Sequence, residues 1–400
     1  MKNNLIYHLL ILMLIGTIAC NKKNDKDYLT QVLSNLEKIQ TASYYVDIEG
    51  WLPGDTASKR NLSYFIKEYA NPSDSTIGSK FVWMDVNDTT LFEFGYDGMI
   101  SASAYHDKNG ILVDDFTARP LPFRPINVPF FNRVSNIIRY ILETPDSITV
   151  ESQDMGDHYH YKLTILEDDQ VEFFGKAHHI NNPYQQDPIS RYELWISKKN
   201  NIPHKLKREM SHDINITVCR NPELNTLSLS DFNLYDYFPK GYEIRKYELR
   251  SNTAEVPNAL IGKRSPEWTL NNVDGNKVSL ADFKSKAVLI NLTGIGCGPC
   301  LISIPSLNKL MKDYSSEHLS IVAIECWGRK KESIKQYINK NHIDYPMLEG
   351  SSTIQADYQT KGSVPVFILL DKDRVVRNVF NGFSQSSTET ELRKAIDSIL

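Results

Sequence analysis

The stretch AVLINLTGIGCGPC, residues 287–300, contains the pattern that decides the fold of the C-terminal part of this chain. Its first half, residues 287–292, is apolar apart from one Asn, which predicts a buried β-strand. Its second half ends in Cys297-Gly298-Pro299-Cys300. Apolar residues then recur at helical spacing through residue 314, so the cysteine pair is expected where a strand passes into a helix.

This setting suits the two cysteines to redox chemistry. At the start of a helix, Cys297 is accessible, and the unpaired amides and the positive end of the helix dipole stabilise its thiolate. Cys300 lies one turn deeper, and Pro299 fits the first turn because its missing N–H has no partner there. Cys297 can attack a substrate disulfide, and Cys300 can then close a Cys297–Cys300 bridge. We therefore expect a redox-active disulfide with no added cofactor.

The rest of the chain suggests a second folded unit, because 400 residues exceed what one core usually holds. Residues 28–250 predict a mainly antiparallel β-sheet with one or two helices, of α+β class, with helices beginning near Asp27 and spanning about Asn132 to Leu142. Residues 251–261 lack a periodic apolar face and predict a linker. Residues 262–400 alternate strands and helices and close with a hairpin and a helix, the order of a thioredoxin-like α/β sandwich.

Residues 256–400 resemble the TlpA/ResA-like branch of the thioredoxin superfamily, membrane-tethered thiol-disulfide oxidoreductases that act outside the cytoplasm. The matching landmarks are Gly262, Pro266-Glu267-Trp268, Leu270, Asp274-Gly275, Val278, Leu280, Phe283-Lys284, Asn291, the cysteine motif, Pro305, Tyr345-Pro346, Tyr358 and residues 364–371. The resemblance implies that Pro365 has a cis peptide bond facing the cysteine pair. It also implies that Val364 offers backbone hydrogen bonds to a substrate segment.

The chain departs from this branch at several positions around the cysteines. Gly296 stands where the family usually has Trp, and Thr293 replaces another common aromatic, which predicts a smaller apolar platform beside Cys297. Ser303 stands where many relatives have a Glu that helps to move protons, and Asn291 cannot accept a proton. Glu325 is a possible substitute, although a position on the surface is the favoured interpretation.

Two further cysteines and the histidines have ordinary explanations. Cys326, at the end of a predicted strand, and Cys219 are interpreted as small buried hydrophobes, although a third redox thiol at Cys326 is conceivable. His158, His160 and His178-His179 are interpreted as residues of a solvated strand face. We expect no metal site, since no second Cys-x-x-Cys or His-x-x-x-His follows the cysteine pair.

The N-terminal sheet resembles the LolA-like lipoprotein-carrier family, in which a curved antiparallel sheet wraps a helix and binds hydrophobic ligands. The resemblance rests on the leading helix and on three segments: Tyr96-Asp97-Gly98, Asn201-Ile202-Pro203 and residues 232–242. It implies a similar fold and a ligand that the sequence does not identify.

The first residues predict export and a lipid anchor. Lys2 precedes an apolar run over residues 5–15, so residues 1–19 are expected to be a signal peptide. The run is too short for a membrane-spanning helix. Residues 16–20 resemble a bacterial lipobox with Thr17 in place of the usual Leu, which implies acylation of Cys20; a plain cleaved signal is the alternative. The polar residues 20–27 then predict a tether. The mature protein is therefore expected to be a membrane-anchored lipoprotein of the periplasm or cell envelope.

The sequence suggests three candidate functions for the whole chain: disulfide exchange, ligand binding and thiol peroxidase activity. A net charge of −4 with no basic stripe argues against nucleic acid as a partner. The favoured function is disulfide exchange with envelope proteins, reduction preferred, supported by a membrane or periplasmic redox partner. The alternative is a lipid- or peptide-binding lipoprotein with a degenerate accessory thioredoxin-like domain. A thiol peroxidase would require Thr three residues before the reactive cysteine, where this chain has Gly294.

Overall fold

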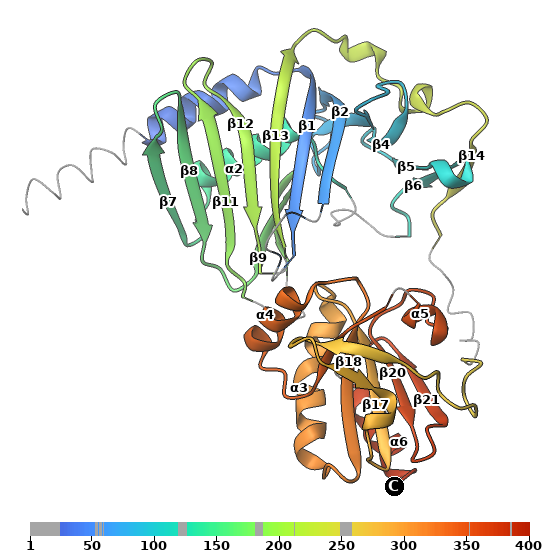
Figure 1. Cartoon of the computed structure of the whole chain (residues 1–400). Coiled ribbons are helices and arrows are strands. Elements are labelled where there is room, and N and C mark those ends of the chain that lie inside the picture. Colours follow the sequence, from blue (N-terminus) through green and yellow to red (C-terminus); the bar gives the residue numbers. More distant parts are fainter. Residues whose placement is uncertain are drawn as a thin grey trace, which may run out of the picture. The chain divides into compact units, whose positions relative to one another are not determined.

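The computed structural model describes residues 25–52, 55, 58, 60–118, 126–180, 187–211, 213–248, 258–351, 353–384 and 386–400. These residues form two compact units, coloured blue to yellow-green and yellow to red in Figure 1. Among the described residues, the first unit contains those between 25 and 50, between 60 and 180, and between 187 and 248. The second contains those from 258 onward, together with Trp51, Leu52, Asp55 and Ser58. The predicted signal peptide, Cys20 and most of the linker lie outside the described residues. Among the helices that the structure describes, none has the length and apolar character needed to cross a membrane.

The N-terminal unit is built on one large sheet, whose strand order is β14-β6-β5-β4-β3-β2-β1-β13-β12-β11-β8-β7. Strand β14 is parallel to β6, and the other neighbouring pairs whose register is resolved, which do not include β1 and β13, are antiparallel. The strands are β1 (Thr41–Trp51), β2 (Arg60–Ala70), β3 (Ser79–Asp85), β4 (Phe92–Tyr96), β5 (Ser101–Tyr105), β6 (Gly110–Asp114), β7 (Ile148–Asp154), β8 (His158–Ile165), β11 (Ser190–Ser197), β12 (Ile202–Glu209), β13 (Ile214–Leu224) and β14 (Glu243–Lys246). This unit is mostly sheet with few helices, as the sequence predicts.

Two helices pack on one face of this sheet. Residues 25–37 form the first, so residues 25–27, expected in the tether, are helical. The second is α2 (Phe130–Glu143), close to the predicted 132–142. Leu29, Val32 and Leu36 of the first helix and Val134 and Ile137 of α2 share one buried core with the strands. Spacings of three and four residues place these side chains on the inner face of each helix.

Smaller elements complete the N-terminal unit. A two-stranded sheet pairs β9 (Gln170–Phe174) with β10 (Lys176–Ile180), and every residue of β9 is buried. Three short 3₁₀ helices are η1 (His106–Lys108), η2 (Leu229–Asp231) and η3 (Leu234–Tyr237). Leu234 of η3 packs with Val82, Met84 and Phe92 in a second core cluster. Val82 and Met84 point to this second cluster, whereas Phe81 and Trp83, the residues between and before them in β3, point to the core that contains α2.

The start of α2 is capped from a distant strand. Its N-cap residue, Pro129, has no side chain that can accept a hydrogen bond. The buried carboxylate of Glu68 on β2 instead accepts the Phe131 and Asn132 N–H groups at 3.3 and 2.8 Å. The Tyr44 hydroxyl donates to Glu68 at 2.6 Å and accepts the Phe130 N–H at 2.9 Å. Because Pro129 has no N–H, these three are all the amides of the first turn that lack a partner within the helix, and all are satisfied.

The C-terminal unit is a thioredoxin-like α/β sandwich. Its seven-stranded sheet has the order β16-β15-β19-β18-β17-β20-β21, with β17 parallel to β18 and antiparallel to β20. The strands are β15 (Thr269–Asn272), β16 (Lys277–Ser279), β17 (Ala287–Thr293), β18 (Leu319–Glu325), β19 (Met347–Glu349), β20 (Val366–Leu370) and β21 (Val376–Asn381). The helices are α3 (Gly298–Asp313), α4 (Lys331–Asn341), α5 (Ile354–Asp357), α6 (Thr388–Asp397) and the 3₁₀ turn η4 (Leu280–Asp282).

Every residue of the central strand β17 is buried, because both faces of the sheet are covered. Leu289 packs with residues of α3, α4 and α6 on one face. Val288 and Ile290 pack with Trp268, Leu280 and Tyr358 on the other. The apolar run at residues 287–292 therefore reflects burial on two sides, which is typical of a central strand in a mixed sheet.

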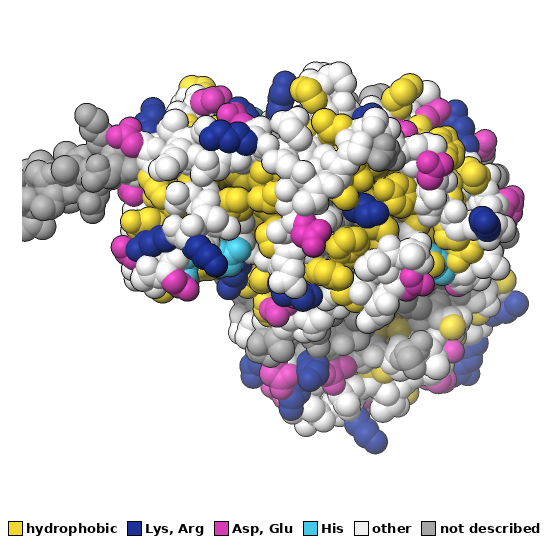
Figure 2. Space-filling view, turned by 90° about the horizontal axis from the view of Figure 1, so that it is seen from above, with side chains coloured by type: hydrophobic (Ala, Val, Ile, Leu, Met, Phe, Trp, Pro, Cys, Tyr) yellow, Lys and Arg dark blue, Asp and Glu magenta, His cyan; other side chains and the backbone are white. Residues whose placement is uncertain are grey.

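The surface carries charges of both signs. Figure 2 shows Lys and Arg side chains interspersed with Asp and Glu on the visible face, around a band of hydrophobic side chains. No broad single-sign patch is seen on this face, which agrees with the small net charge of −4.

The cap at Glu68 predicts a pH-dependent stability. Burial raises the pKa of Glu68 from 4.5 to about 7. Between these two pH values the folded state retains a proton that the unfolded state releases, so this contribution is complete below pH 4.5 and is lost as pH rises through 7. At roughly 1.4 kcal/mol per pKa unit, the free energy of unfolding should fall by about 3 kcal/mol as the pH rises across this range.

Glu68→Gln should therefore flatten the decline in stability between about pH 5 and pH 8, measured by urea unfolding of the full chain. The matched control is Glu37→Gln, because Glu37 is an exposed acid that should leave the wild-type pH dependence intact. Equal pH dependence in wild type and Glu68→Gln would contradict the assignment.

Candidate active site

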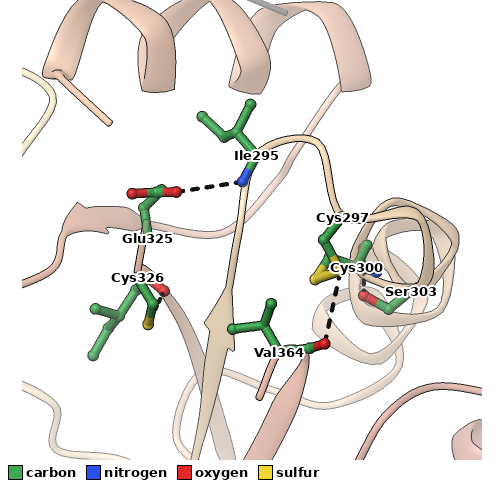
Figure 3. Close-up of a disulfide and its surroundings, with 8 residues drawn as sticks. Ile295, Cys297, Cys300, Ser303, Glu325, Cys326 and Val364 are labelled. Atoms are coloured by element: carbon green, nitrogen blue, oxygen red, sulfur yellow. Dashed lines mark hydrogen bonds between the residues drawn. A yellow bond between two sulfur atoms is a disulfide. The ribbon is translucent and has the colours of Figure 1, made fainter. Parts of the chain in front are cut away.

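The cysteine pair lies where β17 passes into α3 (Figure 3). Cys297 is the N-cap of α3, and its Sγ accepts the backbone N–H of Cys300 at 3.2 Å. Cys297 and Cys300 form a disulfide, with their Cα atoms 5.2 Å apart. Cys297 is 8% exposed and Cys300 is 1% exposed, so an incoming molecule reaches Cys297 first. Gly298 and Pro299 form the first turn of α3, where the Pro needs no hydrogen-bond partner.

The Val364–Pro365 segment faces this pair. The peptide bond between Val364 and Pro365 is cis, as the family resemblance implies. The Sγ of Cys297 lies 3.8 Å from the carbonyl oxygen of Val364, just before β20 (Figure 3). Backbone groups next to the accessible sulfur are therefore available for an extended chain that would approach Cys297.

The turn before Cys297 requires its two glycines for different reasons. Gly296 has φ +96°, a conformation that residues with a side chain rarely adopt. A side chain such as the Trp usual in the family would be strained there. A Cβ on Gly294 would lie 2.6 Å from the ring of Trp327, so Gly294 allows that ring to pack against the backbone. The Cys297 N–H closes the turn on the Gly294 carbonyl at 3.1 Å.

Trp327 is the residue at this site that the sequence reasoning missed. It follows β18 directly, is 44% exposed, and lies against the turn that ends at Cys297. The apolar surface expected to be lost at Gly296 and Thr293 is thus partly supplied by an aromatic ring from another element. The same contact leaves no room for a Thr at position 294, which the peroxidase hypothesis would require.

Glu325 is buried, which corrects the interpretation of this residue as a surface acid. It ends β18, is 0% exposed, and accepts the backbone N–H groups of Ile295, Trp327 and Arg329 at 3.3, 3.0 and 2.8 Å. Burial raises the pKa of Glu325, and these hydrogen bonds and Arg329 lower it. Figure 3 shows the carboxylate directed at Ile295 and away from Cys300. Through these hydrogen bonds, Glu325 joins the loop before Cys297, at Ile295, to the loop after β18, at Trp327 and Arg329.

Neither Ser303 nor Asn291 acts as an obvious base. The Ser303 hydroxyl donates to the Cys300 carbonyl at 2.7 Å within α3. Asn291 is 1% exposed in β17, and its Oδ1 has no hydrogen-bond partner among the described residues. The residue that accepts the proton of Cys300 is not identified by these contacts.

The remaining cysteines are poor nucleophiles. Burial raises the pKa of Cys326 to about 12, and its Sγ lies 3.3 Å from the Ile324 carbonyl oxygen. Burial, reinforced by the charge of Glu68, also raises the pKa of the Cys219 thiol well above its usual range. Because the thiolate is the reactive form, neither cysteine is suited to disulfide exchange. Among the residues that the structure describes, His, Cys, Asp and Glu form no group of three that could hold a metal ion.

Comparisons with known proteins concern this C-terminal unit. Residues 261–379 match the AhpC/TSA family. The thioredoxin-like protein YneN of Bacillus subtilis is 29% identical over 138 residues, 34% of this chain and 78% of that protein. The thiol-disulfide oxidoreductase ResA of Bacillus cereus is 27% identical over 142 residues, 35% of this chain and 82% of that protein. A crystal structure of a putative thiol-disulfide oxidoreductase from Bacteroides vulgatus covers 35% of this chain and 96% of its own, with 26% identity and a TM-score of 0.31.

The contacts of Glu325 predict how its variants behave. Glu325→Gln should lower the free energy of unfolding by about 1–3 kcal/mol, because an NH₂ group replaces an acceptor that faces buried N–H donors. The pH dependence of Cys297 alkylation by iodoacetamide in the reduced protein should keep its wild-type midpoint. Glu317→Gln is the control, since Glu317 is exposed in the same unit. A shifted midpoint would show that Glu325 takes part in proton transfer.

Proposed function

We propose that this chain, whose C-terminal unit is a thioredoxin-like thiol-disulfide oxidoreductase domain, exchanges disulfides with proteins of the bacterial cell envelope through Cys297 and Cys300. The observation that carries the proposal is the difference between the two sulfurs. Cys297 is reachable at the first turn of α3, and Cys300 is buried one turn deeper within bonding distance.

In the reductive direction the reaction has two steps. The Cys297 thiolate attacks one sulfur of a substrate disulfide, which forms a mixed disulfide and releases the other substrate sulfur as a thiolate. After Cys300 loses its proton, its sulfur attacks Cys297 and releases the second substrate thiolate. The substrate gains two electrons, and the enzyme is left with the Cys297–Cys300 disulfide. A protein dithiol, acting as redox partner, returns two electrons and opens this bridge.

The surrounding residues position these steps. The amides of the first turn of α3 and the Cys300 N–H favour negative charge on the Cys297 sulfur. The Val364 carbonyl oxygen, 3.8 Å from the Cys297 Sγ, supports a role of the Val364–Pro365 backbone in hydrogen-bonding an extended substrate segment. The exposed ring of Trp327 offers apolar contact to the same segment. No cofactor beyond the Cys297–Cys300 disulfide is needed.

We favour reduction over oxidation of the substrate. Gly298-Pro299 between the cysteines is the dipeptide of thioredoxin itself. The family branch that residues 256–400 resemble is also largely reductive. The redox partner is then the electron donor, located in the membrane or the periplasm.

The proposed location follows from the first twenty residues. The signal-like residues 1–19 and the lipobox-like residues 16–20 support export and acylation of Cys20, which would anchor the enzyme to a membrane of the envelope. Because extracytoplasmic compartments contain proteins with disulfides, this location also supplies the substrates.

The cysteine variants test the proposed function. Cys297→Ala in the full chain should abolish dithiothreitol-driven insulin reduction, because the attacking sulfur is lost. Cys326→Ala should retain most of the wild-type rate, since the Cys326 thiol is only partly exposed and its raised pKa makes it weakly acidic. Cys300→Ala should accumulate mixed disulfides on Cys297 in cells, to be identified by mass spectrometry.

If the wild-type protein reduces no model disulfide and Cys300→Ala traps no protein, disulfide exchange is wrong for this chain. The alternative function, a lipid- or peptide-binding lipoprotein with a degenerate thioredoxin-like domain, would then be favoured.

The lipid anchor is tested separately. In cells fed radioactive palmitate, the wild-type chain should carry the label and partition with membranes, whereas Cys20→Ala should lose the label. Cys219→Ala provides the control, because this buried thiol is inaccessible to acylation. Label that persists in Cys20→Ala would exclude acylation at this cysteine.

A further inference from the structure

The N-terminal unit contains a cavity that the redox chemistry does not use. Its volume is about 430 Å³, within the range of roughly 300–1,000 Å³ that is usual for small-molecule sites. It lies between the sheet and the start of α2, and most of its lining is aliphatic or aromatic, including Ile66, Trp83, Phe94, Phe130 and Phe173. Such a lining suits the apolar body of a ligand.

One guanidinium in this cavity lacks a partner. Arg133 lines the cavity from the first turns of α2, and its Nε is buried with no hydrogen-bond partner among the described residues. Burial and the nearby Arg208 guanidinium lower the pKa of Arg133. The position is unfavourable for a second reason, since a cation near a helix N-terminus opposes the helix dipole, and the first turn of α2 has no acidic residue.

The carboxylates near Arg133 are already engaged by Arg208. Glu172 accepts the Arg208 Nε at 2.7 Å and also its Nη2, and Asp213 accepts its Nη1. Glu172 therefore interacts with Arg133 electrostatically, without a hydrogen bond between the two side chains. The charged residues of the lining are Arg60, Arg133, Arg208, Glu172 and Asp213. Arg208 is thus matched by two carboxylates, whereas Arg133 has no ion pair among the described residues, and a bound anion would supply one.

We propose that this cavity binds an apolar carboxylate, a monoanion of the chemistry of a fatty acid, whose head group pairs with Arg133. The planar guanidinium offers two parallel N–H donors to a carboxylate, and this pairing is strongest where water is excluded. The hydrocarbon body would lie against the aromatic and aliphatic walls. A neutral alcohol of equal length would leave Arg133 unpaired, and a peptide would bring buried backbone groups for which the apolar walls offer few partners.

The site is independent of the cysteines and remains testable whether or not the proposed redox function holds. The probes are dodecanoate and dodecanol, which share a hydrocarbon chain and differ in charge, and dodecyl phosphate, which carries a different anionic head. Binding to the full chain is measured by isothermal titration calorimetry below the critical micelle concentration of dodecanoate, with the change in total tryptophan fluorescence, to which Trp83 in the cavity wall contributes, as a second signal.

We expect wild type to bind dodecanoate at least tenfold more tightly than dodecanol. Arg133→Gln should weaken dodecanoate binding at least tenfold and leave dodecanol unchanged, and Arg133→Lys should retain part of the preference. Arg139→Gln is the matched control, because Arg139 is on the same helix, is exposed, and pairs with Glu37 outside this cavity. Tighter binding of dodecyl phosphate than of dodecanoate would overturn the carboxylate as the head group.

Folding is checked on the same samples. Without ligand, Arg133→Gln should unfold at an equal or higher temperature than wild type, since it removes an unpaired buried cation. This variant therefore separates loss of binding from loss of folding. No dodecanoate binding by wild type, or equal affinity for dodecanoate in wild type and Arg133→Gln, would overturn the proposal.

Discussion

The first turn of α3 is the constraint on which the active site depends. A helix begins with amides that have no partner, and here the Cys297 sulfur accepts one of them, from Cys300. The same hydrogen bond that caps the helix therefore stabilises charge on the reacting atom. Because Cys300 follows one turn later, the helix also sets the separation that lets the two sulfurs join. Capping, activation and ring closure are consequences of one local geometry, which explains why four consecutive residues contain so much of the chemistry.

Elsewhere in the molecule, buried carboxylates hold backbone segments in place. Glu68 satisfies the start of α2 from a neighbouring strand, and Glu325 joins the loop before Cys297 to the loop after β18. Each carboxylate is desolvated, which raises its pKa, and each is compensated by several N–H donors. Such contacts fix loops more firmly than apolar packing alone, because an N–H left unpaired in the interior is costly. The turn at Gly294 and Gly296 is thereby held in its conformation and in close contact with Trp327.

The sequence predicted those features that depend on local pattern. The strand-to-helix setting of the cysteines and the helix near residues 132–142 were both expected close to their observed positions. Strands β5 and β14 have no clear strand pattern in the sequence, because β5 consists largely of small residues and every residue of β14 is exposed. The burial of Glu325 and the place of Trp327 could not be predicted, since both depend on how the chain turns after β18. The capping of α2 by Glu68 depends on a contact across 64 residues of sequence.

Two ionisable side chains lie at the start of α2, and they differ in their contacts. The Glu68 carboxyl accepts hydrogen bonds there, whereas the Nε of Arg133 has no hydrogen-bond partner among the described residues. The Glu68 carboxyl group lies at the positive end of the dipole and accepts the N–H groups of Phe131 and Asn132, so its burial is explained by its role in the fold. Arg133 is a cation at that same end, faces a cavity, and gains nothing from the helix. A cation without a hydrogen-bond partner at its Nε that borders a largely apolar cavity is better explained by a ligand than by folding. The large N-terminal unit would then contribute a binding function of its own beside the redox chemistry of the C-terminal unit.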